Sequence, residues 1–66
     1  MSIHAKLERV PNIPGAYHLV EDDGNLIALY SKGGYLLVLD PTLQDEIIEW
    51  LQSHNKPVGQ VEVAEQ

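Results

Sequence analysis

Two tight-turn signals divide the central part of the chain into three apolar segments. The dipeptide Asp23-Gly24 is typical of a type I′ turn, because Asp and Gly both accept the positive φ angles that this turn requires. Gly33-Gly34 is a second signal of the same kind. Three strands joined by two-residue turns form a meander. We therefore predict an antiparallel β-meander over residues 16–40, with strands over 16–22, 26–32 and 35–40.

An amphipathic helix is predicted to follow the meander, over residues 41–55. Asp40 can cap its N-terminus, and Pro41 suits the first helical position. Asn55 is a candidate C-cap, and Pro57 completes the stop signal. An apolar stripe recurs at helical spacing and is expected to pack on one face of the sheet, with the tryptophan as its largest contribution. The stripe comprises Leu43, Ile47, Trp50, Leu51 and His54.

The segments at both ends of the chain carry weaker strand signals. Residues 3–10 alternate between apolar and polar side chains, which favours a strand with one solvated face. Pro11 and Pro14 then interrupt regular structure. Val58–Val63 either joins the sheet as a last strand or trails free. We expect one α+β domain over residues 1–66, divided into an N-terminal strand and loop (1–15), the meander (16–40), the helix (41–55) and a C-terminal strand or tail (56–66).

The register set by two-residue turns decides which side chains share a face of the sheet. The first face is aliphatic and suits the helix stripe; it comprises His18, Val20, Ile27, Leu29, Ser31, Leu36 and Val38. The second face is also apolar and holds all three tyrosines; it comprises Tyr17, Leu19, Leu26, Ala28, Tyr30, Tyr35, Leu37 and Leu39. An antiparallel sheet with one solvated face alternates apolar and polar residues, and these strands do not alternate. Both faces therefore need cover, and one helix covers only one of them.

The second face is covered either by the chain's own ends or by another protein. Tyrosine is enriched at protein interfaces because it buries a large area and keeps a polar tip. The terminal segments are short, and one of them contains two prolines. We therefore expect a protein interface, with a second copy or with a different protein, at Tyr17, Leu19, Ala28, Tyr30, Tyr35, Leu37 and Leu39.

Length and charge narrow the functions that this chain can have. A chain of 66 residues buries only about 60% of its unfolded surface, so oligomerisation or docking is an expected aid to stability. It contains no cysteine, which excludes disulfides and thiolate zinc sites. Ten acids oppose four bases, and the net charge of -6 disfavours direct nucleic-acid binding. Apolar runs are too short to span a membrane, and no signal peptide is visible, so we expect a cytoplasmic protein without membrane contact.

Residues that could carry chemistry are few and scattered. His4, His18 and His54 fall at no metal-ligand spacing, so no metal or cofactor is expected. His18 and Ser31 are predicted diagonal neighbours under the helix, but no third group would orient the imidazole. Acidic residues 21–23 and 45–49 suit a solvated turn and the solvated side of a helix. No catalytic residue is predicted.

Three functions remain open, and the leading one is a protein-binding accessory. Such a regulatory or assembly module would form a homodimer or dock on a larger assembly through the tyrosine-bearing face. The second is an acidic inhibitor, of the kind made by viruses or mobile elements, that blocks a basic nucleic-acid-binding site; it requires the acids of 21–23 and 45–49 to gather on one surface. The third is a small-molecule binder with its pocket at a dimer interface. An enzyme is the class with least support.

Overall fold

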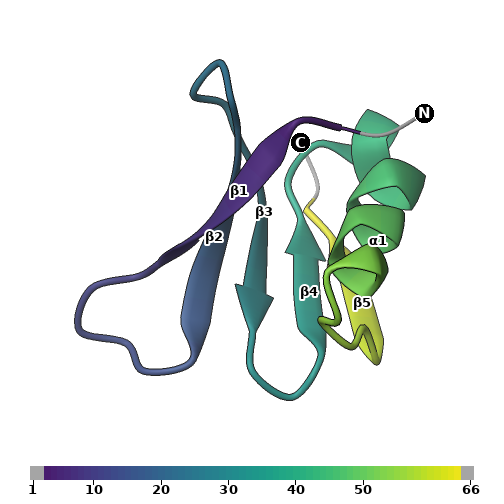
Figure 1. Cartoon of the computed structure of the whole chain (residues 1–66). Helices are drawn as coiled ribbons and strands as arrows, with labels where there is room; N and C mark the ends of the chain where they lie inside the picture. The colour runs from purple at the N-terminus through teal and green to yellow at the C-terminus, as the bar shows by residue number, and fades with distance from the viewer. Residues whose placement is uncertain (1–2, 65–66) are drawn as a thin grey trace.

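A five-stranded, mostly antiparallel sheet and one helix make up this small α+β fold (Figure 1). The computed structural model describes residues 3–64; residues 1–2 and 65–66, which belong to the first and last predicted segments, lie outside the described part. The strands are β1 (Ala5–Arg9), β2 (Ala16–Glu21), β3 (Leu26–Ser31), β4 (Tyr35–Val38) and β5 (Gln60–Val63). A 3-10 turn, η1 (Pro41–Leu43), leads into the helix α1 (Gln44–Ser53).

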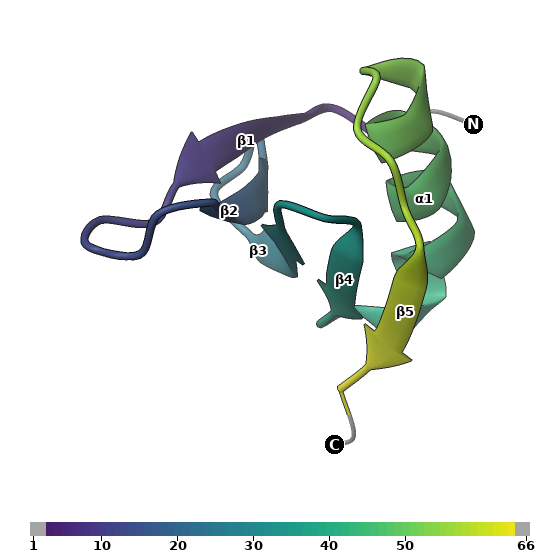
Figure 2. The same ribbon diagram turned by 90° about the horizontal axis from the view of Figure 1, so that it is seen from below.

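The strands lie in the sheet in the order in which they occur in the sequence, from β1 to β5. The first four are antiparallel to their neighbours, and β5 runs parallel to β4. Parallel neighbours need a crossover connection, and α1 supplies it. Both flanking segments thus join the sheet, and the four residues of β5 resolve the alternative of a free C-terminal tail. Seen from below, α1 lies on one side of the curved sheet (Figure 2).

The predicted register is correct in the middle of β2–β3 and wrong elsewhere. Tyr17 faces Tyr30 as expected, but the register shifts after Leu19, where Val20 pairs with Leu26. Ser31 pairs with Tyr35, so the β3–β4 turn contains three residues instead of two. A shift of one residue moves a side chain to the other face of a sheet. The two predicted faces are therefore mixed in the structure.

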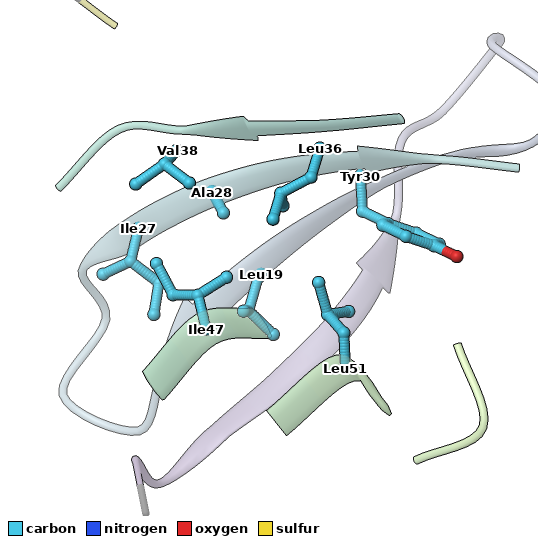
Figure 3. Close-up of a cluster of buried hydrophobic side chains, with 8 residues drawn as sticks. All are labelled: Leu19, Ile27, Ala28, Tyr30, Leu36, Val38, Ile47 and Leu51. Atoms are coloured by element: carbon cyan, nitrogen blue, oxygen red, sulfur yellow. The ribbon is translucent and has the colours of Figure 1, made fainter. Parts of the chain in front are cut away.

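The core lies between the sheet and α1, and it contains eight buried side chains (Figure 3). All are at most 4% exposed, and fully burying one aliphatic side chain stabilises a fold by about 1.5–3 kcal/mol. Trp50 is only partly buried and stacks on His54 with ring centroids 3.8 Å apart, so it is not the main helical core residue that the sequence predicts. The sheet contributes Leu19, Ile27, Ala28, Tyr30, Leu36 and Val38, and the helix contributes Ile47 and Leu51.

The start of the helix follows the predicted capping pattern. One carboxylate oxygen of Asp40, Oδ1, accepts hydrogen bonds from the backbone N–H of Thr42 (3.1 Å) and from its hydroxyl (2.6 Å). Pro41 begins η1, so the first predicted helical turn is a 3-10 turn and the α-helix starts at Gln44. At the other end the C-cap is His54, and Asn55 follows it with a left-handed φ of 62°. A positive φ immediately after a helix is a common way to end it.

Two contacts hold the connection between α1 and β5 against the rest of the sheet. The buried Tyr30 donates its hydroxyl hydrogen to the carbonyl oxygen of Pro57 over 2.6 Å. Burial raises the pKa of the Tyr30 hydroxyl, and the neighbouring Tyr17 raises it further. The carbonyl of Gly34 accepts from the N–H of Gly59 at 2.9 Å, and a Cβ on Gly34 would lie 2.9 Å from that nitrogen. Position 34, at the end of the β3–β4 turn, therefore needs glycine, because the backbone just before β5 passes close to it.

Candidate docking surfaces

The residues of the predicted interface do not share a face of the sheet. Leu19, Ala28 and Tyr30 are core residues beneath α1, at most 4% exposed (Figure 3). Tyr17 lies on the same side, with its ring centroid 6.5 Å from that of Tyr30. Tyr35 and Leu37 lie on the opposite face of the sheet. Leu39 lies just after β4 and is half-buried. The prediction of one common uncovered surface is wrong, because the longer β3–β4 turn places alternate residues of β4 on the other side.

An apolar surface does exist: the cross-strand pairs place its residues on the side of the sheet opposite the core, away from α1. We call it the open face. Three of its members, His18, Val20 and Leu29, were predicted to lie beneath the helix. Tyr35 is 51% exposed and Leu26 is 43% exposed, and the others are half-buried. The open face comprises His18, Val20, Leu26, Leu29, Tyr35 and Leu37.

One end of the open face is hollowed by a groove of about 270 Å³. The β1–β2 loop forms its rim through Val10 and Ile13, and Ile13 is 57% exposed. Backbone bonds hold this loop in place, among them Val10 N–H to the Ala16 carbonyl at 2.9 Å. The groove is somewhat smaller than pockets for drug-sized ligands, which measure about 300–1,000 Å³. It suits one or two inserted side chains. Its lining is completed by Ala16, Tyr17, His18, Leu29, Tyr30, Ser31, Tyr35 and Leu37.

A second hollow, of about 560 Å³, lies at the opposite end of the sheet, beside the start of α1. It brings the β2–β3 turn against the helix, so that both predicted acidic segments contribute to one surface. The backbone N–H of Asp22 donates to the His4 carbonyl at 2.9 Å, which holds the turn against the start of β1. We call this hollow the acidic hollow; its lining is Ile3, His4, Glu21, Asp22, Asp23, Thr42, Leu43 and Glu46. Sequence reasoning identified the acids but could not place them together.

The histidines remain apart, and one of them lies where the sequence did not predict it. His18 and Ser31 both lie on the side of the sheet away from α1, not under the helix. His54 stacks on Trp50, and its Nδ1 lies 2.7 Å from the Trp50 carbonyl oxygen. Within residues 3–64, no three His, Cys, Asp or Glu side chains gather where they could bind one metal ion.

Comparison of the chain with protein-family models, with curated proteins and with solved structures gave no match. In the part of the chain that the structure describes, α1 is too short and too polar to cross a membrane, and no other helix qualifies.

Proposed function

We propose that this chain is a non-catalytic protein-binding accessory that docks an apolar segment of a partner protein on its open face. The observation that supports this proposal is that Leu29, Tyr35 and Leu37 are neighbouring residues on the side of the sheet away from α1, where the 270 Å³ groove lies. Contiguous exposed apolar surface on a small protein marks an interaction site. This proposal keeps the predicted function and moves it to the other face of the sheet.

Tyr35 is the expected anchor of the interface. Its side chain is half-exposed beside the groove, and it can bury its ring while its hydroxyl stays at the rim. Tyrosine is enriched among the few residues that carry most of the binding energy in an interface. Leu29 and Leu37, which are cross-strand partners, form the apolar floor next to it.

Charge favours a partner of different sequence over a second copy. Cross-strand pairing places Glu8, His18, Leu29, Leu37 and Glu62 in one row across all five strands, so that a carboxylate stands at each end of the row; the Glu8 carboxylate also pairs with Lys6 at 3.3 Å. Two copies would each bring a net charge of -6. A segment with apolar side chains at its centre and Lys or Arg at its ends complements this row. We therefore assign the open face to a basic-flanked apolar segment.

Selection from a random 12-residue peptide library against the immobilised chain tests the proposal. We expect enriched peptides with apolar centres and basic flanks, and we expect Tyr35→Ser to weaken their binding at least about tenfold. Gln52→Ser on the exposed side of α1 is the matched control and should bind as the parent does. Lack of enrichment, or peptides that bind Tyr35→Ser as tightly as the parent, would exclude the open face as the docking site.

Light scattering over a range of concentrations tests the choice of occupant. We expect a monomer. A dimer that Tyr35→Ser dissociates would assign the open face to a second copy and would overturn the assignment to a basic-flanked segment.

The acidic hollow supports a second candidate function, that of an acidic protein which occupies a basic site on its target. The supporting observation is that Glu21, Asp22, Asp23 and Glu46 line one hollow. Hexalysine is a suitable probe, and Glu21→Gln/Glu46→Gln should weaken its binding more than Asp45→Asn/Glu49→Gln does. Both double variants remove two charges, but the second pair lies outside the hollow. Equal effects would attribute the binding to net charge and exclude this candidate.

A further inference from the structure

The outer edge of β5 carries unpaired backbone groups. β5 has one strand neighbour in the described residues, β4, and all four of its residues are exposed. The N–H groups of Gln60 and Ala64 donate to carbonyls of Gly34 and Val38, at 3.0 and 2.8 Å. Backbone groups alternate in direction along a strand, so those of Val61 and Val63 point away from β4. An edge of this kind is a template for another strand.

The two edges of the sheet differ in how many charged side chains they carry, and β5 carries fewer than β1. β1 carries Lys6, Glu8 and Arg9 within five residues, and Lys6 pairs with Glu8 at 3.3 Å. Charged side chains on an edge strand discourage the addition of further strands. β5 carries one charge, Glu62, between two valines that are 37% and 40% exposed. The less protected edge is therefore the one at β5.

We propose that β5 binds an extended peptide segment by antiparallel strand addition. Val61 and Val63 pair across the ladder with Leu36 and Val38, so they lie on the α1 side of the sheet and require apolar residues opposite them. Glu62 pairs with Leu37 on the other side and requires Lys or Arg opposite it. The segment therefore has the pattern apolar, basic, apolar. This site goes beyond the proposed function, because it uses a strand edge instead of the open face.

A second copy of this chain fits the edge poorly. Two copies could pair their β5 strands antiparallel about a twofold axis. The outward N–H and C=O groups of Val61 and Val63 then all find hydrogen-bond partners in each other only when Val61 of each copy faces Val63 of the other. That register places Glu62 directly opposite its own symmetry mate. Like charges directly opposite each other destabilise a strand pair. The net charge of -6 per chain adds to the repulsion.

The test uses a synthetic peptide, acetyl-Ser-Thr-Val-Lys-Val-Thr-Ser-amide, and the isotope-labelled chain. The amide hydrogens of Val61 and Val63 should exchange rapidly in the free chain and become protected when the peptide is added. N-methylation of both peptide valines removes the donors that would face β5 and should abolish this protection. Tyr35→Ser should leave the protection unchanged, so a failure of the open face would not affect this result.

A charge swap tests the register. Replacing the peptide lysine by Glu, or Glu62→Lys in the chain, should each weaken binding about fivefold, and the two changes together should restore it. Unprotected Val61 and Val63 amides at millimolar peptide, equal binding of the N-methylated peptide, or no restoration in the double swap would each overturn the proposal. Protection of these amides that appears on concentrating the chain alone would assign the edge to a second copy, which also overturns it.

Discussion

Replacing Leu19 and Leu29 by alanine, one at a time, measures which face of the sheet lies beneath α1. Both changes remove the same atoms from neighbouring strands. Leu19 has no exposed surface and packs in the core, whereas Leu29 is half-buried on the open face. The register predicted from two-residue turns places them the other way round. The two variants therefore separate the two arrangements without any difference in side-chain chemistry.

The expected cost follows from burial. Truncating a fully buried leucine to alanine costs about 2–5 kcal/mol, because a cavity adds to the lost transfer free energy. We expect about 3 kcal/mol for Leu19→Ala. Leu29→Ala leaves no closed cavity, and we expect about 1 kcal/mol from the apolar area that it no longer covers. For 66 residues, the total free energy of unfolding is about 3–10 kcal/mol, so the first variant removes a large fraction of it.

Urea unfolding at pH 7.5, followed by far-UV circular dichroism, gives both free energies under one set of conditions. Thermal unfolding gives a second reading: Leu19→Ala should lower the Tm by roughly 12–24 °C and Leu29→Ala by roughly 4–8 °C, at about 4–8 °C per kcal/mol for a chain of this size. The reasoning is refuted if Leu29→Ala costs as much as Leu19→Ala. That result would place Leu29 in the core and restore the register of two-residue turns.

Three further predictions concern single contacts. Tyr30→Phe should cost about 1 kcal/mol at pH 7 through the lost hydrogen bond. Because the pKa of Tyr30 is raised in the fold, the stability linked to its proton is fully present below about pH 10 and is lost as the pH rises further. The free energy of unfolding should therefore fall less in Tyr30→Phe than in the parent between pH 9 and pH 11. An equal fall in both proteins would contradict the burial of the hydroxyl. In urea unfolding, Gly34→Ala should lower the free energy of unfolding more than Gly33→Ala does. Both glycines have a positive φ, but only a Cβ at position 34 would press on the Gly59 backbone. Equal losses would show that the connection to β5 moves aside without cost. Asp40→Ala should cost about 0.5–2 kcal/mol by thermal unfolding, and no loss of stability would mean that the cap is dispensable.

Several features of this fold are local, and the sequence by itself determined them. Asp40 and Pro41 start the helix, because the cap and the fixed φ of proline act within one turn. Glycines at 24, 33 and 34 mark both β-turns, because their positive φ angles are costly for other residues. The helix stripe likewise identified Ile47 and Leu51 as core residues.

The register of the strands, and with it the face on which each side chain lies, was decided only by the tertiary structure. The β3–β4 turn has one additional residue, and the register shifts after Leu19. Side chains alternate between faces with a period of two, so Tyr30 lies on the α1 side of the sheet and Leu29 on the open face, the reverse of the expected arrangement. Both faces are apolar in the sequence, so composition could not reveal the error. The acidic hollow and the unpaired edge of β5 likewise depend on where α1 returns the chain after β4. Local signals specified the elements, while packing against α1 selected which face is core, because the observed register brings Leu19, Ala28 and Tyr30 onto the same face as Leu36 and Val38.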